Sequence, residues 1–125
     1  MSRARANTVA RERGEKLLDM LCHALVGLVQ RPGPDLTTRQ LGVLMTCALD
    51  DRGNTVRGLA AALNISKPAI TRAVDRLSDL ELLRRAPDPS DRRSVLVYAM
   101  PAGRAFMSYI RRLLSEHFLK SEPSG

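Results

Sequence analysis

The sequence contains few aromatic residues and few cysteines, and both shortages narrow the classes of protein to consider. Its 125 residues include two Phe, two Tyr and no Trp, too few for the aromatic platform that holds single-stranded nucleic acid. Cys22 and Cys47 lie in apolar helical patterns, with no second Cys or His at metal-ligand spacing. This argues against a zinc site or a disulfide framework. We expect both cysteines to be small, buried and unreactive, and we expect no metal and no cofactor.

Long hydrophobic runs are also missing. The longest apolar stretch, around residues 21–29, is interrupted by His23 and Gly27 and is far shorter than the roughly 20 residues that span a bilayer. The N-terminal residues MSRARANTVARERGEK are charged and no cleavage-type signal follows them. The sequence therefore predicts a cytoplasmic protein without membrane contact, and its length predicts a single domain over residues 1–125.

Motifs typical of enzymes are absent, whereas basic residues are abundant. The chain has no Gly-rich phosphate loop and no nucleophile motif, and His23 and His117 are isolated in the sequence, so we expect them to be structural and the protein not to be an enzyme. Lys and Arg number 20 against 13 Asp and Glu, a net charge of +7. This excess favours a polyanionic partner, and the scarcity of aromatic residues favours double-stranded DNA.

Apolar spacing and capping residues predict a mainly helical chain. Thr37 and Gln40 have the spacing of a capping box, Thr55 and Ser66 are expected N-caps, and Pro68 suits a first helical turn. The predicted helices cover residues 8–30, 37–50, 55–63, 66–80 and 101–120. The third and fourth are separated by a tight turn, as in a helix-turn-helix.

Two short strands, 82–86 and 94–99, are predicted after the fourth helix, with a charged connection over residues 87–93. A hairpin beside a helix-turn-helix gives the fold class: mainly α with a small β-hairpin wing, a winged helix-turn-helix. Its core is expected over residues 36–100, and residues 121–125 are expected to be a disordered tail.

The polar face of the fourth helix predicts contact with DNA. The apolar residues around Ile70 define the inner face, and the opposite face carries arginines, a hydroxyl and small side chains. Arginine suits the paired acceptors of guanine, threonine and alanine can contact the thymine methyl group, and a helix N-terminus can meet phosphate. The predicted contacts are Ser66, Lys67, Pro68, Ala69, Thr71, Arg72 and Arg76. The alternative is an ordinary solvated helix face.

The charged connection of the hairpin predicts a second contact. It holds Asp88, Asp91, Arg92 and Arg93, and Asp91 is expected to brace the guanidinium of Arg93 in a defined direction. A braced arginine suits a narrow minor groove, where negative potential is concentrated. The alternative is a polar turn held by an internal Asp91–Arg93 salt bridge.

Three stretches together resemble the MarR family of transcriptional regulators: LTTRQLGVL, TVRGLAAALNISKPAITRAVDRLSDLELLRR and APDPSDRRSVLVYAMPAGRAF. The most specific parts are LAAALNISKPAITRAVDRL and DPSDRR with the following strand and PAGR. In that family the recognition helix enters the major groove and a wing arginine enters the minor groove. The resemblance implies these roles for residues 66–80 and for Arg93, with Arg92 a lesser candidate, in a protein associated with the nucleoid.

Members of the family are usually dimers built from their N- and C-terminal helices. The resemblance implies a homodimer formed through residues 8–30 and 102–120, and two-fold symmetry predicts a pseudo-palindromic DNA site. The residues expected at the interface are Leu18, Leu21, Leu25, Leu28, Phe106, Ile110, Leu113 and Leu114.

Three departures from the family pattern qualify the resemblance. The C-terminal part has room for one helix where the family commonly has two. Glu81 stands where the family typically has glycine, so the fourth helix is expected to end without a left-handed cap, and Gly58 replaces a common acidic residue. Many relatives respond to small aromatic molecules, but the shortened dimer region shrinks the usual cleft and does not support such an effector here. A winged helix that acts as a protein-interaction module is the alternative function.

Overall fold

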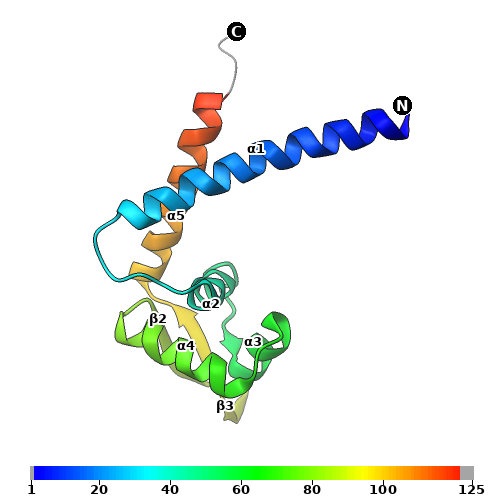
Figure 1. The fold of residues 1–125 in the computed structure, drawn as a ribbon. Coiled ribbons are helices and arrows are strands. Elements are labelled where there is room, and N and C mark those ends of the chain that lie inside the picture. The colour runs from blue at the N-terminus through cyan, green and yellow to red at the C-terminus, as the bar shows by residue number, and fades with distance from the viewer. Residues whose placement is uncertain (1, 122–125) are drawn as a thin grey trace. The chain divides into compact units, whose positions relative to one another are not determined.

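The computed structural model describes residues 2–121, which form five helices and one three-stranded antiparallel sheet (Figure 1). The elements in chain order are α1 (Arg3–Gln30), α2 (Thr38–Ala48), β1 (Asn54–Thr55), α3 (Val56–Leu63), α4 (Lys67–Asp79), β2 (Leu83–Asp88), β3 (Asp91–Ala99) and α5 (Pro101–Ser121). They fall into two compact units. We call the part from Asp35 to Ser108 the winged-helix unit, and we call the chain up to Pro34 together with the part from Tyr109 onward the helical unit.

The helices of the winged-helix unit begin at the predicted caps. Thr37 and Gln40 form a reciprocal capping box, with each side chain accepting a backbone N–H of the other residue at 3.0 Å. The hydroxyl of Thr55 accepts the N–H of Gly58 at 2.9 Å, and Pro68 lies in the first turn of α4. The predicted starts of α2, α3 and α4 are confirmed, because a cap satisfies N–H groups that have no acceptor inside the helix.

The end of α4 contradicts the expectation for Glu81. This residue has a φ of 60°, in the left-handed region, and its N–H donates to the carbonyl oxygen of Ser78 at 2.9 Å. The N–H of Leu82 donates to the carbonyl oxygen of Leu77, also at 2.9 Å. These two bonds form the usual left-handed cap without glycine. The reason is tertiary, because this path places Leu82 and Leu83 in the core.

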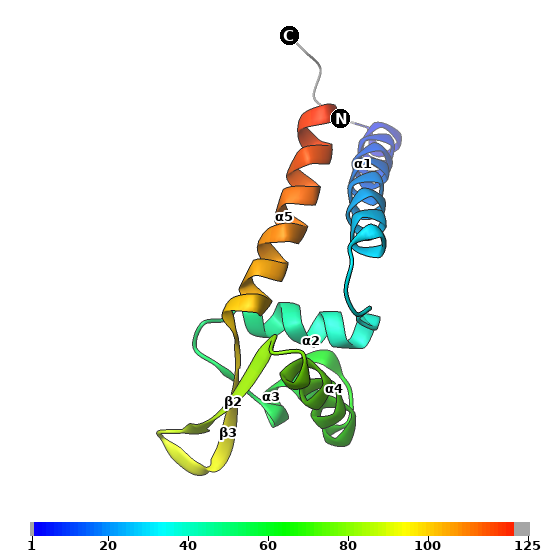
Figure 2. The same cartoon turned by 90° about the vertical axis from the view of Figure 1, so that its left-hand side faces the viewer.

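The sheet has the strand order β1-β3-β2. Strand β1 was not predicted. Its two residues pair with Leu96 and Val97 of β3, and so short a strand has no periodicity of its own. The hairpin is also longer than predicted. Asp88 pairs with Asp91 across a two-residue turn, so most of the connection expected over residues 87–93 is strand. We call the β2–β3 hairpin the wing, and Figure 2 shows it projecting away from α3 and α4.

The core of the winged-helix unit is organised by α4. Ile70, Val74 and Leu77 are fully buried, as predicted for the inner face of this helix. Other elements of the unit supply fully buried partners: Val43, Leu44, Leu59, Leu83 and Val97. A Cβ on Gly103, in the first turn of α5, would collide with the carbonyl oxygen of Leu82. This close approach fixes the first turn of α5 against the residue that precedes β2.

In the helical unit, α1 begins earlier than predicted. Ser2 caps it by accepting the N–H of Arg5 at 3.2 Å, so the helix starts at Arg3 and not near residue 8. Residues 3–7 carry no apolar stripe, so helical periodicity gives no sign of this earlier start. Within residues 2–121, no helix is both long enough and apolar enough to cross a membrane.

Side chains of α5 contact α1 around Gly27. The Tyr109 hydroxyl donates to the carbonyl oxygen of Gly27 at 3.3 Å, and a Cβ on Gly27 would lie 2.7 Å from the Leu113 side chain. The imidazole rings of His23 and His117 lie 5.2 Å apart between their centroids, so these histidines are not isolated as predicted. The helix continues to Ser121, and the remaining residues of the expected tail, 122–125, lie outside the described residues.

Candidate nucleic-acid interface

The face of α4 opposite the core is exposed at nearly all of the predicted positions. Ser66, Lys67, Pro68, Thr71, Arg72 and Arg76 are exposed. Ala69 is the exception, because it is only 6% exposed and belongs to the core. Its predicted contact with DNA is therefore wrong. Ala69 lies next to Ile70 and one helical turn before Ala73, so the buried stripe is one residue wider than the sequence analysis assumed.

An ion pair that was not predicted links α4 to the wing. The guanidinium of Arg85, on β2, contacts a carboxylate oxygen of Asp75, on the exposed side of α4. Asp75 carries the one negative charge between Arg72 and Arg76, the two arginines predicted to contact base edges, and the ion pair with Arg85 offsets that charge. The two residues are ten positions apart. Because their contact depends on the packing of β2 against α4, no local sequence pattern predicts this ion pair.

The carboxylate of Asp91 does not brace the guanidinium of Arg93 as predicted. One oxygen accepts the backbone N–H of Arg93 at 2.9 Å, and the other accepts the hydroxyl of Ser94 at 3.2 Å. Within the described chain these two residues form no side-chain ion pair. The backbone N–H two residues along is within easy reach of an Asp side chain. The carboxylate therefore bonds within the start of β3, and the exposed Arg93 has no ion pair within the described residues.

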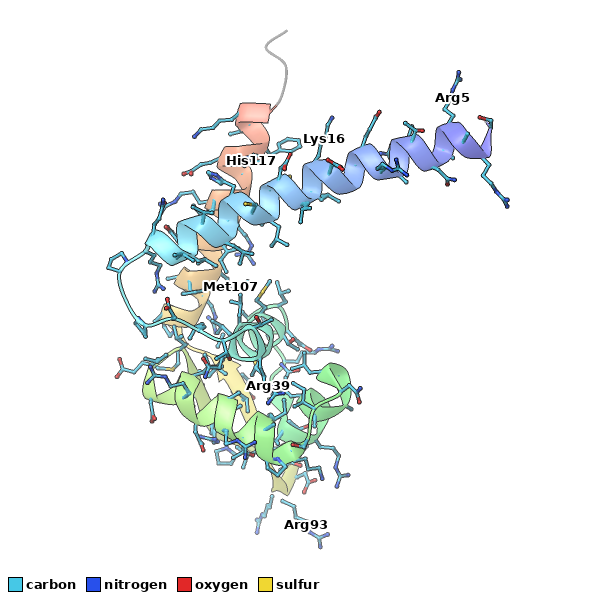
Figure 3. All side chains as sticks on the ribbon, viewed as in Figure 1. Arg5, Lys16, Arg39, Arg93, Met107 and His117 are labelled. Carbon is cyan, nitrogen blue, oxygen red and sulfur yellow. The ribbon has the colours of Figure 1, made fainter. Side chains whose placement is uncertain are left out.

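The turn of the wing is held in the same way. The carboxylate of Asp88 accepts the N–H and the hydroxyl of Ser90, at 2.9 and 2.8 Å. These bonds, the side-chain one first, lower the pKa of Asp88 below its usual value. Both carboxylates are thus turned toward the backbone, while Arg92 and Arg93 are exposed. Figure 3 shows Arg93 projecting from the wing into solvent, which suits a groove contact.

A second cationic contact stiffens the base of the wing. Arg84 and Tyr98 are directly paired across β2 and β3, and the guanidinium carbon lies 5.5 Å from the centre of the ring. A cation over an aromatic face is attracted by the ring quadrupole. This contact joins the two strands of the wing through side chains as well as through the ladder, and the Asp75–Arg85 pair connects the wing to α4.

The helical unit presents an uncovered apolar face on α1. Leu18, Leu21 and Leu25 are 63%, 50% and 45% exposed, and Leu28 is half-buried. With Cys22 and Val26, the three leucines line a groove of about 440 Å³. Cys22 is exposed, which corrects the expectation that it is buried. Large apolar side chains exposed together at one place typically mark a contact with another molecule.

The expected interface residues of α5 divide differently. Phe106, Ile110 and Leu113 are each less than 9% exposed within this chain, so they are core residues, and their assignment to the dimer surface is wrong. Leu114 is half-buried. Helical spacing identifies an apolar face, but it does not say whether the same chain or a second chain covers that face.

The buried thiol of Cys47 matches its predicted inert character. The side chain is 2% exposed, and burial, together with the nearby charge of Asp50, raises its pKa to about 11. Almost no thiolate forms at neutral pH, and the thiolate is the reactive species.

Comparison with known proteins places this geometry in context. The sequence model described as the MarR family matches residues 35–94. The HTH-type transcriptional repressor NicR of Pseudomonas putida is 35% identical over 86 residues, which are 68% of this chain and 53% of that protein. The chain thus spans about half the length of that repressor.

Solved structures share the fold. The transcriptional regulator Tm0710 of Thermotoga maritima superimposes with a TM-score of 0.77 at 20% identity, over 91% of this chain and 78% of that one. A cysteine-to-serine mutant of MarR from E. coli, complexed with operator DNA, gives 0.62 at 23% identity, over 95% and 82%.

Proposed function

Because this chain belongs to the MarR family of winged helix-turn-helix transcriptional regulators, we propose that it regulates transcription by binding specific sequences in double-stranded DNA in the cytoplasm. The observation that carries the proposal is the exposed polar face of α4 beside a wing that exposes Arg92 and Arg93 at the start of β3. A helix with a rigid inner face and an arginine-bearing outer face fits the major groove, whose base edges differ for every base pair.

In the proposed docking, α4 lies in the major groove. Arg72 and Arg76 reach base edges, Thr71 and Pro68 contact the groove floor, and Ser66 and Lys67 approach phosphate at the N-terminus of the helix. The wing places Arg93, with Arg92 beside it, in the adjacent minor groove. The hydrogen bonds of Asp88 and Asp91 to the backbone support this arrangement, because they keep both carboxylates occupied within the turn.

The proposed active form is a homodimer that joins through the uncovered apolar face of α1. Leu18, Leu21 and Leu25 form its centre, with Leu28 and Leu114 at its margin. Their exposure supports the proposal, since a charged protein of this size rarely leaves several leucines of one helix face in water. A two-fold dimer would present two copies of α4 and would require two half-sites about one helical turn apart.

Selection of bound sequences from a random duplex pool, at roughly physiological salt, tests both parts of the proposal. Enrichment of a two-fold symmetric motif is the expected result, and the Arg72→Ala protein run in parallel should lose preference at defined positions. A motif without symmetry would count against the dimer alone. If the folded protein enriches nothing, DNA reading is wrong and the winged helix would be a protein-interaction module.

A further inference from the structure

A hollow of about 650 Å³ lies within the winged-helix unit, between the starts of α3, α4 and β3. Three basic side chains from these three elements line it: Arg57, Lys67 and Arg93. All three are exposed. The hollow also has one carboxylate, that of Asp91, so its lining carries a clear excess of positive charge. Lys67 and Arg93 were each predicted to contact DNA, whereas Arg57 was not.

Tertiary pairing brings these groups together. Thr55 pairs with Leu96 of β3, which holds the start of α3 beside that strand, and Arg57 follows two residues later. Both oxygens of Asp91 accept hydrogen bonds from β3 itself. Within residues 2–121, none of the three cations forms an ion pair. Their charge is therefore available to an anion from outside the chain.

We propose that this hollow receives a phosphodiester of the DNA backbone and that Arg57 is a DNA-binding residue. The inference rests on the proposed function. One sugar-phosphate strand separates a major groove from the adjacent minor groove. If α4 lies in the first and Arg93 in the second, that strand must pass between α4 and the wing, and the hollow occupies this space. The first N–H groups of α3 and α4 add partial positive charge at the same place.

The test is Arg57→Ala in the full chain, with affinity measured for a selected duplex and for an unrelated duplex between about 50 and 200 mM salt. Both affinities should fall by about five- to tenfold at low salt, because a phosphate contact is made with any sequence. The slope of log affinity against log salt should become shallower by about 1. Arg57→Lys, which keeps the charge, should retain most of the slope.

Arg111→Ala is the matched control, because it removes the same charge from an exposed position on α5 of the helical unit. It should leave the slope unchanged. If Arg57→Ala keeps wild-type affinity and slope while Arg72→Ala weakens binding, the hollow does not receive the backbone, and the proposed function stands. A changed base preference in Arg57→Ala would also overturn the inference. If the wild-type protein binds no duplex, the proposed function and this inference both fail.

Discussion

Glu81, the left-handed residue after α4, allows the free-energy cost of backbone strain in this fold to be measured. Glu81 has a φ of 60°, a conformation that costs a residue with a Cβ about 1–2 kcal/mol. Glycine avoids this cost but loses more freedom on folding, worth about 0.5–1 kcal/mol. The side chain of Glu81 is exposed, so little contact is lost. The strain that glycine removes exceeds the entropy that it costs, so Glu81→Gly should raise the free energy of unfolding by about 0.5–1 kcal/mol.

Urea and thermal unfolding, followed by circular dichroism, measure this change. Wild type and variant are compared at equal concentration, because dimerisation would make Tm depend on it. The expected gain corresponds to a rise in Tm of roughly 2–5 °C for a chain of this size. Asn64→Gly is the matched control. Asn64 ends α3 with a φ of 52°, but asparagine tolerates the left-handed region better than glutamate does, so its gain should be smaller.

The stability changes of Glu81→Gly and Asn64→Gly, compared with each other, test whether backbone strain is the cause. Equal effects from Glu81→Gly and Asn64→Gly would show that the gain does not come from the strain of a residue poorly suited to this region. A loss of stability in Glu81→Gly would show that the glutamate side chain or the stiffness of its backbone contributes more than the strain costs. DNA affinity should not change in Glu81→Gly, because Glu81 follows the C-terminal end of α4, whereas the proposed phosphate contacts Ser66 and Lys67 lie at its start.

Three further predictions concern the proposed contacts and the cysteines. Arg72→Ala and Arg93→Ala should each weaken duplex binding by roughly 1–3 kcal/mol in a fluorescence anisotropy titration, and Arg72→Ala should also relax base preference. Unchanged affinity in both would contradict the docking. Leu25→Asp should dissociate the dimer in sedimentation experiments, because it places a charge in the apolar face of α1; a variant that stays dimeric would locate the interface elsewhere. Iodoacetamide at about pH 8 should modify Cys22 and spare Cys47, whose pKa of about 11 leaves almost no thiolate; equal labelling by mass spectrometry would contradict the burial.

Much of the winged-helix unit could be predicted because its signals are local. The capping pairs at Thr37, Thr55 and Ser66 lie within three residues of their partners. The core stripe of α4 follows from helical periodicity alone. Local signals alone therefore predict the order of helix, turn, helix and hairpin, and they also predict that Arg72 and Arg76 are exposed.

The wrong predictions have a different origin. In each of them, a side chain could be covered or bonded by more than one group, and the sequence does not show which group it contacts. Ala69 is buried by neighbouring elements, and Phe106 is covered within the chain and not by a second copy. The carboxylate of Asp91 accepts the backbone N–H of Arg93 and the hydroxyl of Ser94, and it does not bond the guanidinium of Arg93. Periodicity identifies the apolar side of a helix, but only packing shows what covers it.

The starts of α2, α3 and α4, the face of α4 that carries the arginines and the family resemblance could all be predicted from the sequence, because these depend on residues within about one or two helical turns. Three features depend on tertiary packing: the ion pair between Asp75 and Arg85, the left-handed cap at Glu81 and the hollow that Arg57 and Arg93 both line. The ion pair forms because β2 packs against α4, and the cap forms because the chain buries Leu82 and Leu83. The hollow forms because β1 pairs with β3, which brings the start of α3 beside that strand. All three depend on the packing of the core.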